Sequence, residues 1–314
     1  MQTIIIGAGV SGLLLADELS KSGVDSFILE KSRGVGGRMA TKRIQDFSFD
    51  QGAPFFTARD PRFVEKVNDW KRQEVVEAWN FSSLDCWRGS PTMNAVAKYL
   101  AQGKTVRREC KVSTISQNQE GWVLKTDEGE FIECGRLLIT VPIPQALVLL
   151  KSERALLNSE VLERLEEVQY EPCLAGCFLL RGGSEIPETG VVEKDDFFSW
   201  ISDQTAQEGK DRLHSKIVVH APGDWSLKNY AMPEEELLAI FENRLKPWIG
   251  NGMILEKRLH RWKFARVINP YSELFYLNRE GTLGMAGDGF GGAKVEGAAL
   301  SGMALARAIV ENRE

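Results

Sequence analysis

The sequence predicts an α/β fold in which two domains are interleaved, and three observations lead to this prediction. An apolar, β-branched run at residues 3–6 is followed by a glycine-rich turn, a helical pattern at 10–21 and a second strand pattern at 26–30, the order expected of one βαβ unit. A β-rich stretch occupies residues 106–141. The chain closes with a strand pattern, another glycine-rich turn and a helical pattern. The two ends and part of the middle therefore predict one domain, and the remaining segments predict a second, mixed α+β domain.

The turn after the first strand pattern has the spacing of a dinucleotide-binding fingerprint. It consists of Gly7-Ala8-Gly9-Val10-Ser11-Gly12. Gly7 permits the tight turn, Gly9 leaves room for a diphosphate against the backbone, and Gly12 lets the helix pack closely on the strand. The free N–H groups and the positive dipole end of the helix favour the diphosphate. Because a strand pattern precedes the turn and a helical pattern follows it, we expect a Rossmann-type nucleotide site.

The segment after the second strand pattern indicates which nucleotide is bound. Glu30 ends that pattern 18 residues after Gly12 and can accept hydrogen bonds from an adenosine ribose. It is followed by Lys31-Ser32-Arg33-Gly34-Val35-Gly36-Gly37-Arg38-Met39. The glycines let the backbone lie against a ligand, and Arg38 would bring positive charge near the diphosphate. An acidic residue, a short gap and Gly-Gly-Arg resemble the FAD signature of the amine oxidase and glutathione reductase group of flavoproteins, so the resemblance implies FAD.

A third motif lies near the C-terminal end and consists of Gly287-Asp288-Gly289-Phe290-Gly291-Gly292. Its glycines also have the fingerprint spacing, but too few residues follow them to build a second βαβ unit. We interpret the motif as a second flavin contact. The resemblance places Asp288 on the ribityl hydroxyls, and the helix that begins near Val295 would face the flavin pyrimidine and stabilise negative charge there.

The remaining elements follow from periodicity and from turn residues. Further helices are expected at 61–71, 91–101, 159–168, 233–245 and 294–310. Further strands are expected at 41–50, 106–115, 122–126, 131–133, 136–141, 174–180, 217–220, 255–263 and 282–286. Pro142 and Pro144 should end a strand and mark a boundary. The predicted FAD-binding domain comprises 1–60, 96–145 and 276–314, and the predicted substrate domain comprises 61–95 and 146–275.

Composition restricts the possible partners. The formal net charge of -5 argues against nucleic acid, so an anionic ligand must be held by specific local groups. The five cysteines are scattered, which predicts free thiols in a reducing compartment and no metal site. The apolar N-terminal run lacks the basic start of a signal peptide, and the apolar run at 137–150 is too short to span a bilayer. We therefore expect a cytoplasmic protein without a membrane partner.

Four segments together resemble the renalase family of flavin oxidases, in the same order and over essentially the whole chain. They are residues 49–63, 141–146, 260–265, and 287–288 with 295–298. The resemblance implies oxidation of the 2- and 6-dihydro isomers of NAD(P)H to NAD(P)+, with O2 reduced to hydrogen peroxide. Gly289 stands where many relatives carry an aromatic residue, so this wall of the pocket is expected to differ. Because no cysteine follows Cys177, and thioether-linked flavins use a C-terminal cysteine, FAD should be bound non-covalently.

The expected FAD contacts are spread over five or more segments. They are Gly7, Ala8, Gly9, Val10, Ser11, Gly12, Glu30, Lys31, Gly36, Gly37, Arg38, Met39, Gly52, Ala53, Pro54, Phe55, Val112, Gly287, Asp288 and Val295.

The candidate substrate pocket includes the strand pattern at 255–263 and its continuation. His260, Trp262 and Phe264 alternate and should share one strand face, with Lys263 on the other. Trp262 or Phe264 would form a pocket wall, although core packing explains both equally well, and an isolated His260 is more often structural. Arg59 or Lys263 would attract the phosphates of a dinucleotide.

Two alternatives remain open from the sequence. An amine oxidase or carotenoid-type desaturase would use the same scaffold, and an amine oxidase would want a lysine near flavin N5, a position that Lys263 could be taken to fill. A non-catalytic FAD-binding sensor belongs to a different class, and fast flavin turnover with any substrate excludes it.

Overall fold

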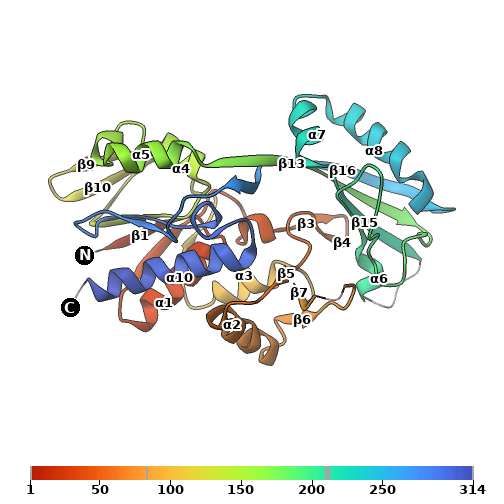
Figure 1. Cartoon of the computed structure of the whole chain (residues 1–314), viewed down its shortest axis with the longest axis horizontal. Coiled ribbons are helices and arrows are strands. Elements are labelled where there is room, and N and C mark those ends of the chain that lie inside the picture. Colours follow the sequence, from red (N-terminus) through yellow and green to blue (C-terminus); the bar gives the residue numbers. More distant parts are fainter. Residues whose placement is uncertain (1, 83, 209–212, 313–314) are drawn as a thin grey trace.

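The computed structural model describes residues 2–82, 84–208 and 213–312. A six-stranded sheet forms the centre of one half of the molecule (Figure 1), with strand order β17-β18-β12-β1-β2-β8. Its strands are β1 (Thr3–Ile6), β2 (Ser26–Leu29), β8 (Thr105–Arg107), β12 (Arg136–Ile139), β17 (Tyr276–Leu277) and β18 (Leu283–Met285). Only the edge strand β17 is antiparallel to its neighbour. Because both faces of this sheet are covered, its inner strands are almost continuously apolar.

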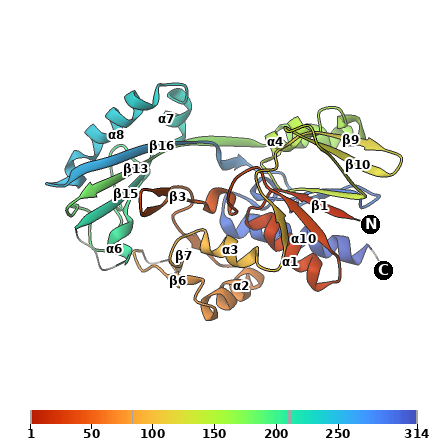
Figure 2. The ribbon, with the colours of Figure 1, turned by 180° about the vertical axis from the view of Figure 1, so that it is seen from behind.

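Helices cover one face of this sheet and a second sheet covers the other (Figures 1 and 2). Ile5 of β1 packs among α1 (Val10–Lys21), α2 (Pro61–Arg72), α3 (Ala95–Leu100) and α10 (Val295–Glu311). Ile4 and Ile6 point to the opposite face, which is covered by β9 (Val112–Asn118), β10 (Gly121–Thr126), β11 (Phe131–Cys134), α4 (Ile143–Leu149) and α5 (Ser159–Glu166). The alternation of β1 side chains thus joins two hydrophobic cores.

The other half is a four-stranded antiparallel sheet with order β14-β15-β13-β16. Its strands are β13 (Gln169–Arg181), β14 (Trp200–Asp203), β15 (His214–His220) and β16 (Met253–Asn269). One face packs on α7 (Gly223–Lys228) and α8 (Glu234–Ile249), around the buried Phe178 and Phe241. The other face packs on a hairpin of β3 (Thr41–Ile44) and β4 (Phe47–Asp50). The long strands β13 and β16 pass from this half to the first (Figure 1).

Smaller elements complete the fold. They are β5 (Phe56–Thr57), β6 (Val76–Ala78), β7 (Cys86–Gly89), α6 (Gln204–Glu208), α9 (Asp288–Gly291), and the 3-10 turns Gly37–Met39 and Arg154–Leu156. Every helix within the described ranges is too short or too polar to span a lipid bilayer.

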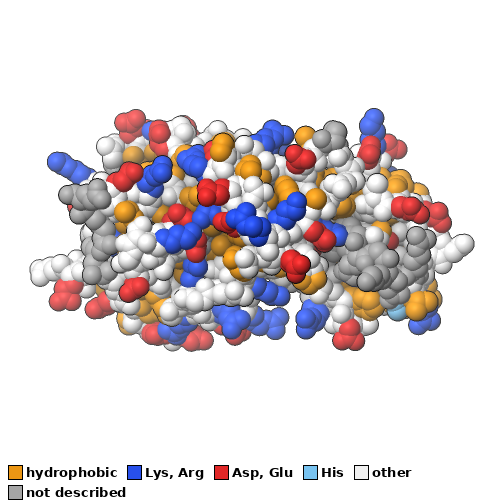
Figure 3. Space-filling view, turned by 90° about the horizontal axis from the view of Figure 1, so that it is seen from below, with side chains coloured by type: hydrophobic (Ala, Val, Ile, Leu, Met, Phe, Trp, Pro, Cys, Tyr) orange, Lys and Arg blue, Asp and Glu red, His pale blue; other side chains and the backbone are white. Residues whose placement is uncertain are grey.

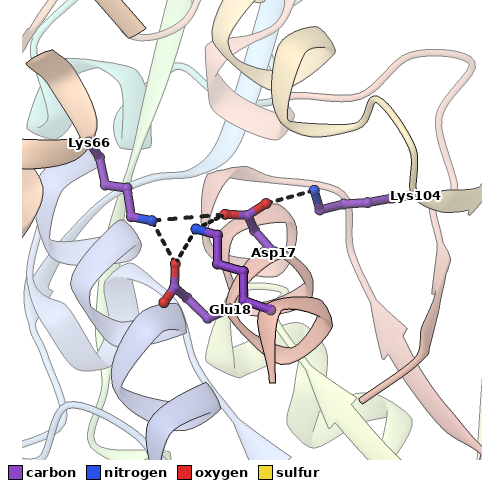
Figure 4. A network of polar contacts seen from close by, with 5 residues as sticks. Asp17, Glu18, Lys66 and Lys104 are labelled. Atoms are coloured by element: carbon purple, nitrogen blue, oxygen red, sulfur yellow. Dashed lines mark hydrogen bonds and ion pairs between the residues drawn. The ribbon is translucent and has the colours of Figure 1, made fainter. Parts of the chain in front are cut away.

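An ion network on the helical face fastens α1 to its neighbours (Figure 4). Lys66 of α2 lies 2.6 Å from Glu18 Oε1, and Lys104 lies 3.0 Å from Asp17 Oδ1. Lys21 lies within 3.0 Å of both carboxylates. Three separate stretches of chain are therefore tied together at a partly buried position.

Several expected elements differ from those in the structure. The pattern at 41–50 is not one strand but the β3–β4 hairpin, which turns at Gln45 with a positive φ of 52°. The pattern at 106–115 is split between β8 and β9, which belong to different sheets, with a break at Glu109 (φ 56°). Pro142 and Pro144 do not simply end a strand, because they lie at the start of α4, where proline fits the first helical turn.

The packing of two segments differs from the expected division into domains. Phe63, Val67 and Trp70 of α2 share a core with α1 and α10, so α2 packs with the first half, whereas Trp79 and Phe81 pack on Trp200 of the second. Leu147 and Leu165 share a core with β9 and β10, so residues 146–168 pack with the first half as well. We therefore propose that the second half is built mainly from residues 169–269.

Candidate active site

The turn between β1 and α1 has the geometry of a diphosphate cradle. Gly7 has a φ of +108°, a conformation that side chains disfavour. A Cβ atom on Gly12 would lie 2.1 Å from the Gly7 carbonyl oxygen, so α1 can approach β1 this closely only with glycine there. A Cβ atom on Gly9 would meet nothing within 4 Å. A ligand can therefore approach the backbone at the N-terminus of α1.

Glu30 lies beside this turn, at the end of β2. Its Oε2 accepts a hydrogen bond from Ala8 N and its Oε1 accepts one from Ser32 N, both at 2.8 Å. Only 7% of the residue is exposed. The carboxylate is thus fixed in place, and an ionised carboxylate has further lone pairs for the hydroxyl groups of a ribose.

The Gly-Gly-Arg loop lies against the same turn. Gly36 N donates to Ala8 O at 2.8 Å, and a Cβ atom on Gly37 would lie 3.5 Å from Gly9 Cα. Met39 anchors the loop, because its side chain is buried in the core beneath. The structure therefore brings the first two motifs together around one position.

A second loop holds Arg38 from the other side. Ala53 N donates to the Arg38 carbonyl oxygen at 2.8 Å. A Cβ atom on Gly52 would lie 2.0 Å from that oxygen and 3.3 Å from the Trp262 ring. Gly52 is thus confined between the Gly-Gly-Arg loop and β16, so Trp262 reaches the loops expected to hold the cofactor.

The guanidinium of Arg38 is paired with Asp288. Nη1 donates to Oδ2 and Nη2 to Oδ1, both at 2.6 Å. Nη1 also lies 3.2 Å from the Phe264 carbonyl oxygen and 3.3 Å from that of Ala265. Burial opposes the charge of Arg38, but the neighbouring Asp288 carboxylate raises its pKa above the ordinary value. In the structure Arg38 therefore joins the second and third motifs to β16, and its place near a diphosphate stays a prediction.

Tyr170 of β13 completes this cluster, and no local sequence pattern pointed to it. Its hydroxyl donates to Asp288 Oδ1 at 3.2 Å. Its ring lies edge-on to Phe264 with centroids 5.7 Å apart, and the Arg38 guanidinium lies 5.9 Å from the ring centre. Burial and, secondly, the negative charge of Asp288 raise the pKa of the phenol, so Tyr170 stays protonated.

The face of β16 that carries His260 and Trp262 is the one that meets the cofactor loops. Trp262 Nε1 donates to the Gln51 carbonyl oxygen at 3.0 Å, and the His260 ring packs on Trp262 with centroids 4.2 Å apart. Burial and, secondly, the Lys42 ammonium lower the pKa of His260. His260 is therefore neutral near pH 7 and lies beside the indole.

His220 supports the same loop from β15. Its Nε2 lies 3.1 Å from the Gln51 carbonyl oxygen and, because that oxygen can only accept, Nε2 carries the proton. Burial lowers the pKa of His220 to about 4. The imidazole is therefore a neutral donor near pH 7, and together with Trp262 it ties the loop to the second half.

Lys263 lies outside the wall that His260 and Trp262 form on β16. It is exposed, and its ammonium lies 5.5 Å from the centre of the Phe264 ring. The neighbouring Arg261 donates to the carbonyl oxygens of Tyr230 and Met232, on the side of the α7–α8 connection. The structure thus does not bring Lys263 together with the cofactor loops.

The N-terminus of α10 begins at Val295, as expected, and is joined to the Arg59 segment by a buried carboxylate. Glu296 Oε1 accepts hydrogen bonds from Arg59 N at 2.6 Å and Asp60 N at 2.7 Å. An open pocket of about 530 Å³ adjoins this contact. Its charged lining residues are Arg59, Asp60, Arg266, Lys294 and Glu296. Arg59 is exposed at its rim, where a guanidinium can meet an anionic group.

Two more of the residues expected to contact FAD, Phe55 and Val112, lie further from the turn at Gly7–Gly12. Phe55 belongs to a packed aromatic group with Trp79, Phe81 and Trp200, with ring centroids 4.6–6.3 Å apart. Val112 is buried at the start of β9, just after Cys110, whose N–H donates to the Glu30 carbonyl oxygen.

Gly287 precedes Asp288 at the end of the central sheet. Its N–H donates to Ser301 Oγ of α10 at 2.8 Å. Pro54 is half-buried and Lys31 is exposed. These residues border the cradle without a contact that assigns them a more specific role.

Comparison with known protein families agrees with this geometry. Residues 5–70 match the NAD(P)-binding Rossmann-like domain. Residues 80–310, well over half of the chain, match the family of flavin containing amine oxidoreductases. The chain belongs to this amine oxidoreductase family. Like the family, it is an FAD-dependent oxidoreductase, and the turn at Gly7–Gly12, the fixed Glu30 carboxylate and the Gly-Gly-Arg loop fit FAD.

Individual relatives agree with this membership. The chain is 20% identical to renalase from Mus musculus over 98% of both chains. It is 33% identical to a lycopene-forming phytoene desaturase from Pseudescherichia vulneris over 30% of this chain and 20% of the relative.

Solved structures share the fold. A putative protoporphyrinogen oxidase from Exiguobacterium sp. 255-15 has a TM-score of 0.79 at 13% identity, over 99% of both chains. An oxidoreductase from Methanosarcina mazei has a TM-score of 0.67 at 13% identity, over 98% of this chain and all of the other. The chain therefore shares its fold with both structures over nearly its whole length.

Proposed function

We propose that this protein oxidises the 2- and 6-dihydro isomers of NAD(P)H, with O2 as the electron acceptor. The reaction balances as NAD(P)H + H+ + O2 giving NAD(P)+ + H2O2. The observation that carries the proposal is the character of the wall beside the cofactor loops. Trp262 offers a planar ring there, and its N–H already donates to Gln51 O. Such a wall suits a flat pyridine ring that must be stacked and oriented.

The polar groups of this wall favour a reaction without proton abstraction by the protein. The Tyr170 phenol has a raised pKa and donates to Asp288. The protonated Nε2 of His220 faces Gln51 O, and its pKa is lowered to about 4. FAD supplies the hydride acceptor and the route to O2 when it is bound. A dihydropyridine becomes aromatic on losing hydride, so it needs orientation and exclusion of water more than a general base.

Charge near the α10 pocket favours an anionic substrate. Three basic residues, Arg59, Arg266 and Lys294, and two acidic residues, Asp60 and Glu296, line this pocket. Arg266 is paired with Glu171 and Glu296 accepts from backbone N–H groups, so Arg59, which was expected to attract dinucleotide phosphates, and Lys294 are the cations that a phosphate would meet. Elsewhere, Lys and Arg side chains are interspersed with Asp and Glu over the face seen in Figure 3, without a broad area of one sign. The similarity to renalase over nearly the whole chain supports the same substrate class.

Anaerobic rapid mixing tests the proposal. The purified flavoprotein is mixed with 2-, 6- and 1,4-dihydro NAD(P)H, and the oxidised flavin band at about 450 nm is followed. We expect fast bleaching with the 2- and 6-isomers and slow bleaching with the 1,4-isomer, whose hydride sits on a different carbon. Admission of O2 should then restore the band and yield one H2O2 per substrate. Fast bleaching by a primary or secondary amine, with no response to any dihydropyridine, would instead establish an amine oxidase.

A further inference from the structure

Gly289 is required for space and not for backbone conformation. Its φ lies outside the left-handed region that favours glycine. A Cβ atom there would lie 2.7 Å from Ile143 Cδ1 and 2.8 Å from the Tyr170 hydroxyl oxygen. Both distances are shorter than real Cβ contacts, so a side chain at 289 requires both Tyr170 and Ile143 to move. The room that it would take is occupied by the Tyr170 hydroxyl and the end of the Ile143 side chain.

The Tyr170 hydroxyl uses this room to reach Asp288. It donates to Oδ1 at 3.2 Å, and the same oxygen accepts from Arg38 Nη2. Oδ2 accepts only from Arg38 Nη1 among the hydrogen bonds of the described residues. An ionised carboxylate has about four lone-pair sites. Oδ1 is therefore saturated, and Oδ2 is the oxygen with capacity for a hydroxyl group of a ligand.

We propose that Tyr170 is a positioning residue for the flavin half of FAD, acting through Asp288 in the space that Gly289 leaves. The phenol occupies the second acceptor site of Oδ1 in a carboxylate that Arg38 already holds, so that Oδ2 is the oxygen left for a ribityl hydroxyl. The ring also packs on Phe264, so the same residue aligns β16 with the cofactor. The proposal rests on FAD binding and not on the identity of the substrate.

Binding of two nucleotides to the deflavinated full-length protein tests the proposal. ADP carries the adenosine ribose and the diphosphate, whereas FAD adds the ribityl chain and the flavin. Tyr170→Phe removes one hydrogen bond to a charged group, so FAD affinity should fall by about tenfold while ADP affinity stays that of wild type. A purely structural defect would lower both affinities. The ratio of FAD affinity, measured by flavin fluorescence quenching, to ADP affinity, measured by calorimetry, therefore distinguishes positioning from a structural defect.

Gly289→Ala gives an independent route to the same effect. The added methyl group must push the Tyr170 hydroxyl away, so FAD affinity should fall with ADP affinity retained. The double variant should bind FAD no more weakly than Gly289→Ala alone, because both changes remove one contact. Tyr271→Phe is the matched control. Its backbone N–H donates to Gly289 O, but its hydroxyl is not part of the Asp288 cluster, so both affinities should be unchanged.

Two outcomes would overturn the proposal. One is an unchanged ratio of FAD to ADP affinity in Tyr170→Phe, whether both affinities fall or neither does. The other is a loss of FAD affinity in Tyr271→Phe as large as that in Tyr170→Phe. Neither measurement involves turnover, so failure here is distinct from failure of the proposed reaction.

Discussion

At the scale of single residues, we propose that the two carboxylates of the site contact opposite ends of FAD. Glu30 is held by Ala8 N and Ser32 N beside the turn at Gly7–Gly12, whereas Asp288 belongs to the cluster with Arg38. Glu30→Gln keeps the shape of the side chain but removes a charged acceptor worth roughly 1.5–3 kcal/mol. ADP and FAD should then both bind about tenfold to a hundredfold more weakly, in contrast to Tyr170→Phe. Exposed Glu128 provides the control, since Glu128→Gln should leave both affinities unchanged, and wild-type ADP binding by Glu30→Gln would contradict the role.

At the scale of helices, the ion network of α1 makes stability depend on acid. Burial opposes ionisation of Asp17, but hydrogen bonds from Lys21 and Lys104 lower its pKa below 3.8. Burial also opposes ionisation of Glu18, but hydrogen bonds from Lys66 and Lys21 lower the pKa of Glu18 below 4.5. A carboxylate with a lowered folded pKa stabilises the protein above its unfolded pKa and loses this contribution as the pH falls through the folded value. The contribution is therefore complete above about pH 4.5 to 5 and declines below it.

Lys66→Met tests this dependence. Urea unfolding should show a loss of stability at pH 7 of up to about 1 kcal/mol, and the difference from wild type should shrink between pH 4.5 and pH 3. Lys71 lies on the same helix outside the network, so Lys71→Met serves as the control. If the difference in unfolding free energy between Lys66→Met and wild type stays constant from pH 7 to pH 3, the network contributes no pH-dependent stability.

At the scale of the whole molecule, FAD would be bound by segments that lie far apart in the sequence. The turn at Gly7–Gly12, the Gly-Gly-Arg loop, the Gly52 loop, Asp288 and the start of α10 converge on one site. None of the five cysteines follows Cys177. Cys177 is buried and Cys173 is half-buried, and burial raises the pKa of each thiol to about 12, which makes them poor nucleophiles.

FAD should therefore be bound tightly without a covalent link. Acid precipitation is expected to release all of the yellow cofactor into the supernatant as FAD. Because the folded state alone offers the complete site, added FAD should also raise the melting temperature of the deflavinated protein in a concentration-dependent way. Flavin that remains in the acid pellet, or FMN in place of FAD, would contradict this expectation.

The sequence predicted those parts of the fold whose signals are local. The β-branched run at 3–6 and the helical pattern at 10–21 predicted the bounds of β1 and α1 to the residue. Each glycine of the turn between them has a steric reason that depends on its neighbours. The β3–β4 hairpin was missed because no glycine or proline marks its turn. The one local signal is the pair of consecutive polar residues Gln45 and Asp46, which interrupts the alternation. Local periodicity therefore identifies a strand more reliably than the place where it reverses.

The site was predicted as separate pieces and not as a cluster. Both Arg38 and Asp288 were expected to contact FAD, but their pairing joins residues 250 positions apart. Tyr170 lies 118 positions from Asp288 and stands in no motif. The only sequence feature related to Tyr170 was the glycine at 289. A position without a side chain indicates that another residue occupies the space, but it does not identify that residue.

The continuity of β13 and β16 has a consequence for how a substrate enters. The strands are 13 and 17 residues long and pair from Gln169↔Asn269 to Arg181↔Met253, with shifts of register near Gln169, Glu171 and Leu179. They form a long two-stranded connection between the two halves. A hinge across the paired strands β13 and β16 would have to break several of their ladder hydrogen bonds at once, each worth about 0.5–1.5 kcal/mol. We therefore expect the halves to move as one body during turnover. Access would then depend on loops and side chains at the rim of the pocket, so solvent viscosity should affect the rate far less than in enzymes whose domains swing open.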